Sequence, residues 1–167
     1  MKKRYVLFLL LLLLLLVWGL LFGCSDDGEQ APWQVYYPTQ SYFEGATLAS
    51  EGFDPAETPT VEDLMVRLLS GPESESLVSP FPKGTSLRSF YLKDSVAYIN
   101  LSEAYGGLSG IQLTLADYAI TLTLCQLPEV EGVSITVEND PVPFRYRQIL
   151  TSADVLLEEQ EPAAVGP

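Results

Sequence analysis

The sequence has 167 residues, of which 22 are acidic and 9 are basic, and its net charge is −13 at pH 7. A surface this acidic repels the phosphates of nucleic acids and of anionic lipids, so we expect neither as a partner. The sequence has no histidine and only two cysteines, which excludes histidine-dependent catalytic triads and the common zinc sites. We therefore predict no enzyme activity and no catalytic, cofactor-binding or metal-binding residues.

The N-terminal segment predicts export and a lipid anchor. A basic triplet at residues 2–4 precedes an apolar run, residues 6–22, that contains no charge. The length of this run lies between that of a cleaved signal and that of a membrane span, which needs about 20 apolar residues. The run ends in LFGC (residues 21–24), which resembles the bacterial lipobox. Residues 1–23 are therefore interpreted as a lipoprotein signal peptide, and Cys24 as the lipidated residue.

The alternative is an uncleaved N-terminal anchor in which Cys24 has no special role. Both interpretations place the rest of the chain outside the cytoplasm, because the basic triplet stays inside. We expect a chain anchored by lipid to the extracytoplasmic face of the cell membrane. Without residues 2–4 the exported part keeps 22 acidic and 6 basic residues, which makes its net charge −16.

The exported part is predicted to contain one domain with flexible ends. Residues 24–32 form an acidic tether, residues 33–157 the domain, and residues 158–167 a disordered acidic tail. The domain begins with a strand over residues 33–37, which are aromatic and β-branched and precede Pro38. A short strand around residues 47–49 is an alternative to a loop.

The middle of the chain predicts a helix and a hairpin. Thr60 and Asp63 have the spacing of a capping box, apolar residues follow at helical spacing to Leu69, and Gly71-Pro72 ends the pattern. Residues 87–92 and 96–101 then predict paired strands that are joined by a polar turn.

The next segment, residues 111–127, is ambiguous because its end alternates like a strand. Its length and a Ser109–Gln112 capping box favour a helix that ends before Pro128. Residues 133–137 predict a half-buried strand with one solvent-exposed face. Further strands are expected within residues 142–150 and at the start of residues 151–157. The order strand, helix, two strands, helix, strand predicts an α+β fold in which two helices pack on one face of a mixed sheet.

The residues that could carry chemistry have simpler explanations. Cys125 lies in an apolar stretch and is expected to be a buried, unreactive thiol. Pairs of carboxylates can catalyse glycoside hydrolysis. The acidic pairs of this sequence, however, fall in predicted loops, helix starts or tails, where solvated charge is the usual state: Asp26 with Asp27, Glu62 with Asp63, Glu73 with Glu75, Glu129 with Glu131, and Glu158 with Glu159.

Four stretches together resemble the GerMN domain of sporulation and spore-germination proteins. They are LMVRLLSGP (residues 64–72), FPKGT (81–85), DSVAYINLS (94–102) and LCQLPEVEGVSITVEND (124–140). The resemblance covers about residues 34–157. It implies an extracytoplasmic lipoprotein whose domain is related to ring-building motifs and acts through protein–protein contact, without catalytic residues.

The leading hypothesis is thus a membrane-tethered module that binds an envelope or spore-assembly protein in sporulation or germination. The alternative is a lipoprotein that captures a small molecule or a peptidoglycan fragment. An anchored hydrolase would need carboxylates that converge in a cleft. Stacking on a sugar would use aromatic side chains from this set: Trp33, Tyr36, Tyr37, Tyr42, Phe43, Phe90 and Tyr91.

Overall fold

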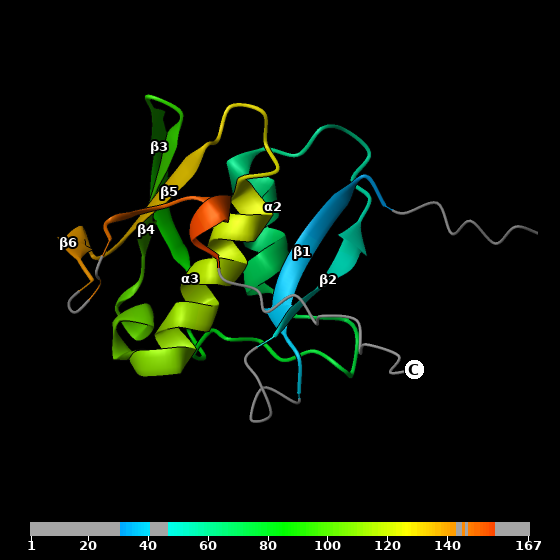
Figure 1. Ribbon diagram of the computed structural model, residues 1–167, viewed down its shortest axis with the longest axis horizontal. Coiled ribbons are helices and arrows are strands. Elements are labelled where there is room, and N and C mark those ends of the chain that lie inside the picture. The colour runs from blue at the N-terminus through cyan, green and yellow to red at the C-terminus, as the bar shows by residue number, and fades with distance from the viewer. Residues whose placement is uncertain (1–30, 41–46, 143–144, 146, 156–167) are drawn as a thin grey trace, which may run out of the picture. The chain divides into compact units, whose positions relative to one another are not determined.

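The structure of the chain is a computed structural model, and it describes residues 31–40, 47–142, 145 and 147–155 (Figure 1). The predicted signal peptide, Cys24 and the whole of the predicted acidic tail, residues 158–167, lie outside these residues, so the predicted boundaries stay predictions. Within the described residues, no helix has both the length and the apolar character that crossing a bilayer requires.

The first two strands form a small sheet of their own. β1 (Trp33–Pro38) pairs antiparallel with β2 (Leu48–Phe53), which is longer than the short strand considered for this region. The other edge of β1 is closed by side chains at the end of helix α3 (Gly110–Leu124). The Gln34 N–H donates to Gln126 Oε1 at 2.9 Å, and the Tyr36 N–H donates to Thr123 Oγ1 at 3.2 Å. These bonds satisfy backbone groups that would otherwise accept another strand.

The first predicted helix is confirmed as α2 (Val61–Leu69). The Asp63 N–H donates to Thr60 Oγ1 at 3.2 Å, and the Thr60 N–H donates to Asp63 Oδ2 at 2.9 Å, which completes the predicted capping box. The bonds that Thr60 donates hold the pKa of the Asp63 carboxyl below its usual range. Gly71 follows the helix with a φ of +90°, a conformation that glycine adopts without strain.

The main sheet contains the remaining strands: β3 (Leu87–Lys93), β4 (Val96–Leu101), β5 (Gly132–Val137), β6 (Asp140–Pro141) and β7 (Ile149–Leu150). β3 and β4 are antiparallel, β4 and β5 are parallel, and both β6 and β7 pair antiparallel with β5. The predicted hairpin is confirmed, and its two turn residues, Asp94 and Ser95, have φ values of 52° and 59°. Two consecutive positive φ values are the signature of a type I′ turn.

The predicted second helix is also confirmed, as α3, but its cap is not. Ser109 stands at the N-cap, yet its side chain accepts no hydrogen bond from the first turn. Gly110, the next residue, has a φ of +56°. This left-handed start displaces the first turn from the geometry that a capping box requires, and it explains why the expected Ser109–Gln112 box is wrong.

The C-terminal segment departs most from the predictions. Within the described part of residues 142–150, only Ile149–Leu150 form a strand, the two-residue β7, where a longer return strand was predicted, and residues 152–154 form a 3-10 helix instead of a strand. The Thr151 N–H and hydroxyl both donate to Asp154 Oδ2, which stabilises this turn. Ser134 of β5 is buried and not solvent-exposed as predicted, since β7 pairs alongside it.

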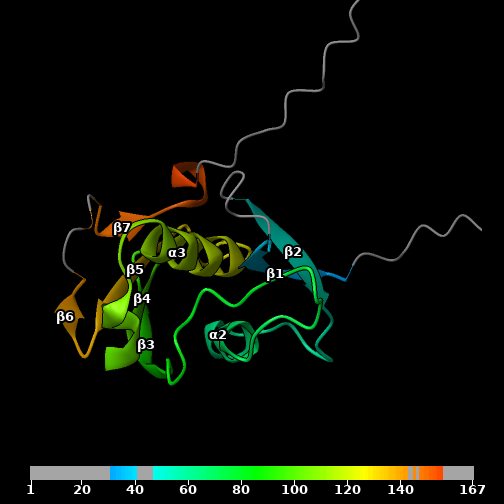
Figure 2. The same cartoon turned by 90° about the horizontal axis from the view of Figure 1, so that it is seen from below.

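The fold class is confirmed as α+β, with the strands divided between two sheets. Figure 2 shows α2 and α3 on the same side of the main sheet, with α3 between that sheet and β1. The core between them is built from alternate residues of the strands and the inner faces of both helices. Its largest fully buried side chains include Tyr37, Leu64, Met65, Ile99, Tyr105 and Ile120.

Candidate functional site

A pocket of about 850 Å³ lies between the N-terminal half of α3 and a C-terminal part that comprises Arg145 and residues 147–154. Its lining combines backbone and hydroxyl groups with an aromatic ring and a charged pair, and it includes Gly107, Ser109, Thr114, Tyr118, Arg147 and Asp154. Arg147 and Asp154 form an ion pair. The hydrogen bonds that Thr151 donates hold the pKa of the Asp154 carboxyl below its usual range. The charges of the lining are therefore largely neutralised within the pocket itself.

A buried ion pair forms one wall of this pocket. Asp117 of α3 accepts hydrogen bonds from Arg145 Nε at 2.9 Å and from Arg145 Nη2 at 2.6 Å. Arg145 Nη1 also donates to the carbonyl of Ile135 at 2.8 Å, and the hydroxyl of Tyr105 donates to Asp117 Oδ1 at 2.6 Å. Both charged side chains are almost fully buried. The network attaches the C-terminal segment to α3 and to β5.

Burial is the main influence on the pKa values of Asp117 and Tyr105 in this network. It raises the pKa of the Asp117 carboxyl, while the guanidinium of Arg145 and the hydroxyl of Tyr105 act in the opposite direction. Burial and the neighbouring carboxyl of Asp117 raise the pKa of Tyr105 well above its ordinary value, so this phenol stays protonated. Two hydrogen bonds from the arginine and one from the buried phenol occupy three of the roughly four acceptor positions of this carboxylate. Its geometry is that of a structural contact.

A second charged cluster lies where α2 ends. Arg67 of α2 pairs with Glu51 of β2, donates to the carbonyl of Gly71 at 2.8 Å and pairs with Glu73 at 3.2 Å. The carboxylate of Glu51 also accepts the backbone N–H groups of Glu73 and Ser74. These contacts hold the loop after Gly71-Pro72 against the small sheet, so Arg67 and Glu51 have a structural role.

The motif residues Gly84 and Ser102 are joined directly. Ser102 Oγ donates to the carbonyl of Gly84 at 3.0 Å and accepts the Ser86 N–H at 3.0 Å. Gly84 has a φ of +89°. Beside them, the ring of Phe81 stacks on that of Tyr105 with centroids 6.4 Å apart. The structure thus explains two of the four family-like stretches as one partly buried junction between the loop before β3 and the end of β4.

The face of the main sheet opposite the helices carries exposed aromatic and apolar side chains. The rings of Tyr91 and Tyr98 stack in parallel with centroids 4.6 Å apart. Tyr91 on β3 is 57% exposed and Ile149 on β7 is 43% exposed. Within the described residues, no helix covers this face, as Figure 2 shows. Such a surface is typical of a contact area for another macromolecule.

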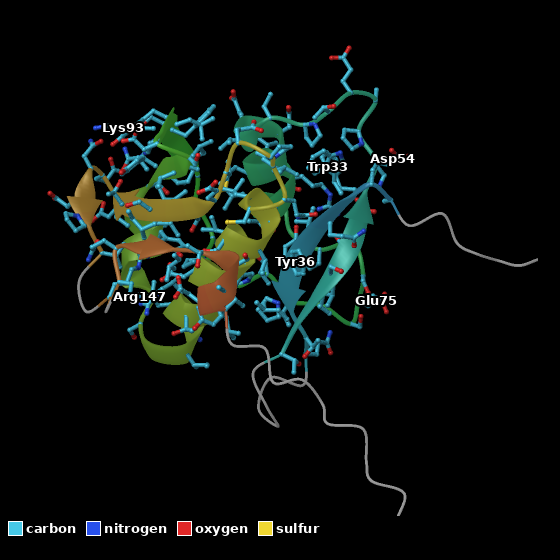
Figure 3. All side chains as sticks on the ribbon, turned by 45° about the horizontal axis from the view of Figure 1, so that its top comes forward. Trp33, Tyr36, Asp54, Glu75, Lys93 and Arg147 are labelled. Atoms are coloured by element: carbon cyan, nitrogen blue, oxygen red, sulfur yellow. The ribbon has the colours of Figure 1, made fainter. Side chains whose placement is uncertain are left out.

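The aromatic set considered for sugar stacking does not gather on one surface. Tyr37 is fully buried, and its hydroxyl donates to the carbonyl of Leu68 at 3.1 Å. Trp33 and Tyr36 also lie on β1, whereas Lys93 marks the β3–β4 hairpin of the other sheet, which carries Phe90 and Tyr91 (Figure 3). Tyr42 and Phe43 lie outside the described residues.

The chemical groups singled out in the sequence lie apart from one another. Within residues 31–40, 47–142, 145 and 147–155, no three potential metal ligands come together. Glu62, Glu129 and Glu131 are solvent-exposed, Glu73 pairs with Arg67, and the anchor residue Cys24 lies outside the described part. Cys125 is half-buried, and burial raises the pKa of its thiol.

No sequence pattern had identified Asp117, Arg145 or Glu51, whose side chains are at most 13% exposed and are held in ion pairs. One signal was available for Asp117. It is the only charged residue in the apolar stretch of residues 111–127, and such a charge on a buried helix needs a partner. Nothing in the sequence identifies that partner as Arg145, since the two are 28 residues apart.

Comparisons with known proteins give one consistent result. The family model Germane, described as "Sporulation and spore germination", matches residues 34–143. The first GerMN domain of the sporulation protein GerM from Bacillus subtilis superposes with a TM-score of 0.60 at 13% identity, covering 73% of this chain and 98% of that domain. No curated protein sequence matches the chain.

Two further structures are similar. The tandem GerMN domains of the same Bacillus subtilis protein give a TM-score of 0.58 at 13% identity, and the match covers 74% of this chain and 46% of the tandem. A crystal structure assigned as a lipoprotein of Clostridium perfringens gives a TM-score of 0.50 at 24% identity, with 72% and 87% covered. At these identities the likeness establishes the fold.

Proposed function

Because this chain belongs to the Germane family of sporulation and spore germination, we propose that it is a membrane-tethered module that binds another exported protein in one of these processes. The role is non-enzymatic and depends on surface contact. The observation that carries it is the sheet face opposite the helices, where the stacked rings of Tyr91 and Tyr98 and the side chain of Ile149 remain available to a partner.

The lipid anchor at Cys24 is part of the same proposal. The lipobox-like residues 21–24 support cleavage after residue 23 and lipidation of Cys24. Residues 24–32 then serve as the tether, residues 33–157 as the domain and residues 158–167 as the tail. The likeness of the domain to a ring-building motif, and with it a role in assembly, also belongs to this proposal.

The experiment has two parts. Intact-mass analysis of the membrane fraction should show a lipidated mature chain, and Cys24→Ala should leave the precursor uncleaved. Affinity capture of the tagged full-length chain from sporulating cells should recover an envelope or spore protein, and deletion should impair spore formation or germination. Normal spores together with an empty capture would disprove the module, and an unmodified N-terminus would disprove the anchor.

A second candidate function is capture of a small molecule or a peptidoglycan fragment. The observation in its favour is the pocket of about 850 Å³, a size typical of small-molecule sites, with Ser109, Thr114 and Tyr118 in its lining. The test is a titration of the purified protein with peptidoglycan digests, in which NMR follows the chemical shifts of the backbone amides. Shifts confined to the pocket and lost in Tyr118→Ala would support capture, and unchanged spectra would eliminate it.

A further inference from the structure

Strand β3 leaves one of its edges open. In the described residues the main sheet runs from β3 through β4 to β5, so β4 is the single neighbour of β3 (Figure 2). The two-residue turn at Asp94 and Ser95 makes Lys93 and Val96 a hydrogen-bonded pair, and the pattern alternates from there. Phe90 and Leu92 therefore direct their backbone N–H and C=O groups away from β4, toward the open edge.

The middle of this edge lacks the usual protection against strand pairing. β3 has seven residues and contains no proline, and its only irregularity lies at Arg88, near its start. Tyr91 is 57% exposed and Leu92 is 44% exposed. Proteins normally shorten, bend or cover a flat apolar edge, because such an edge accepts another strand. An edge left open in this way is suited to binding an extended segment.

The charges on β3 indicate what that segment carries. Six basic residues lie in the described part of the chain, and three of them are held in ion pairs away from β3: Arg67, Arg145 and Arg147. Arg88 and Lys93 both lie on β3, and the pair of Arg88 with Glu138 is exposed on both sides and therefore weak. In a chain of net charge −13, the open edge is thus flanked by positive charge at each end.

The same charges disfavour a second copy of this chain as the occupant. In an antiparallel pair of two β3 strands, Phe90 of each copy would exchange hydrogen bonds with Leu92 of the other, which places Lys93 opposite Ser89. The second copy would then bring two more basic side chains to this edge and no acidic ones, and the two chains, each of net charge −13, would repel each other. A strand with acidic residues at its ends would instead place them next to Arg88 and Lys93, where the opposite charges attract.

We propose that the open edge of β3 binds an extended, acidic segment of a partner protein by strand addition. The inference rests on the proposed function as an interaction module and specifies the chemistry of the partner. Main-chain hydrogen bonds to Phe90 and Leu92 supply the affinity, and Arg88 and Lys93 select for acidic residues. The side chains of Tyr91 and Leu92 supply apolar contact on the two faces of the added strand.

The test uses the purified chain and a displayed library of peptides of about 12 residues, long enough to span the strand. The selected peptides should be enriched in Asp and Glu and in residues that favour strands. Hydrogen exchange with a selected peptide bound should protect the amides of Phe90 and Leu92. A library that yields no binders, or binders without acidic enrichment, would overturn the proposal.

Two variants separate backbone pairing from charge. Leu92→Pro removes a free-edge N–H without removing a bond to β4, and it should weaken the selected peptides about tenfold or more. Lys93→Glu should weaken them about threefold to tenfold. Lys83→Glu is the matched control, because Lys83 is exposed in the loop before β3 and not on the strand; its affinity should stay within about twofold of the unmodified chain.

Folding of Leu92→Pro is checked by its thermal transition, and Lys93→Glu tests the proposal independently of any proline effect. If Lys83→Glu and Lys93→Glu weaken peptide binding equally, the preference for acidic peptides does not come from the basic residues on β3, and this part of the proposal is wrong. In cells, Leu92→Pro should fail to complement the deletion. If the deletion has a defect and Leu92→Pro complements it fully, strand addition is wrong, but the proposed function as an interaction module is not affected. If the deletion has no defect and affinity capture recovers no partner, the proposed function fails, whatever the peptides bind.

Discussion

Arg145 donates two hydrogen bonds to the carboxylate of Asp117, from Nε at 2.9 Å and from Nη2 at 2.6 Å. The two residues are 28 positions apart and belong to different segments. Both side chains are almost fully excluded from solvent. The contact fixes the C-terminal segment on α3, and its removal has a consequence that depends on pH.

Arg145→Met should destabilise the domain by about 3–5 kcal/mol at pH 7, since it leaves a buried carboxylate without its cation. Loss of Arg145 removes the main influence that lowers the pKa of Asp117, so this pKa rises further. A raised native pKa gives stability that is present at low pH and is lost as the pH rises through it. The deficit of the variant should therefore shrink on acidification.

Urea denaturation at several pH values measures this deficit. The control is Arg88→Met, which breaks the exposed pair with Glu138 and should cost about 0–1 kcal/mol. Equal losses in the two variants, or a deficit that grows on acidification, would contradict the assignment.

Gly84→Ala should destabilise the domain by about 1–2 kcal/mol, because Gly84 has a φ of +89° and an alanine there is strained. Gly107→Ala is a matched control, since an added Cβ meets no atom within 4 Å at either position and the φ of Gly107 is not positive. It should leave the free energy of unfolding within about 0.5 kcal/mol. If the two variants unfold at the same urea concentration, the junction of Gly84 with Ser102 is less restrictive than its geometry indicates.

Burial raises the pKa of Tyr37 from 10.0 to about 12, with Arg67 acting in the opposite direction. The native state thus keeps this phenol protonated at a pH where the unfolded chain ionises it. The stability that Tyr37 contributes is complete below pH 10 and is lost as the pH rises from 10 toward about 12. Tyr37→Phe should flatten the fall of the unfolding free energy in this window. An unchanged slope would show that other groups cause the fall.

Cys125 should react with iodoacetamide more slowly than free cysteine at pH 8. Burial raises the pKa of its thiol, although the Ser152 N–H acts in the opposite direction, and the thiolate is the reactive form. Mass spectrometry of Cys24→Ala, in which Cys125 is the remaining cysteine, follows the reaction without interference. A rate equal to that of free cysteine would mean that the region around Ser152 opens readily.

The features that sequence predicted correctly depend on neighbours in the chain. The cap of α2 joins Thr60 to Asp63, three residues away, and the β3–β4 hairpin closes over two turn residues. The fold class followed from these elements and their order. The cap of α3 has the same sequence pattern but fails, because the left-handed φ of Gly110 changes the path of the chain.

The features that sequence did not predict depend on distant contacts. The length of β2 depends on pairing with β1, and the burial of Ser134 depends on β7. The pocket is formed by residues 106–118 on one side and by Arg145 with residues 147–154 on the other, and its charged wall joins Asp117 to Arg145. Neither charge has a local pattern that identifies its partner, so this site could be located only once the chain was folded.

The closed outer edge of β1 has a mechanical consequence. β1 is the first strand after the segment that would carry the tether, so a pull from the membrane would act along it. Its six paired residues face β2, and Gln126 and Thr123 of the α3 region hold its other side. Because ladder hydrogen bonds run perpendicular to a strand, such a force would load them together instead of opening them one after another. If the proposed tether precedes β1, its tension would therefore act on the domain at a point that resists it.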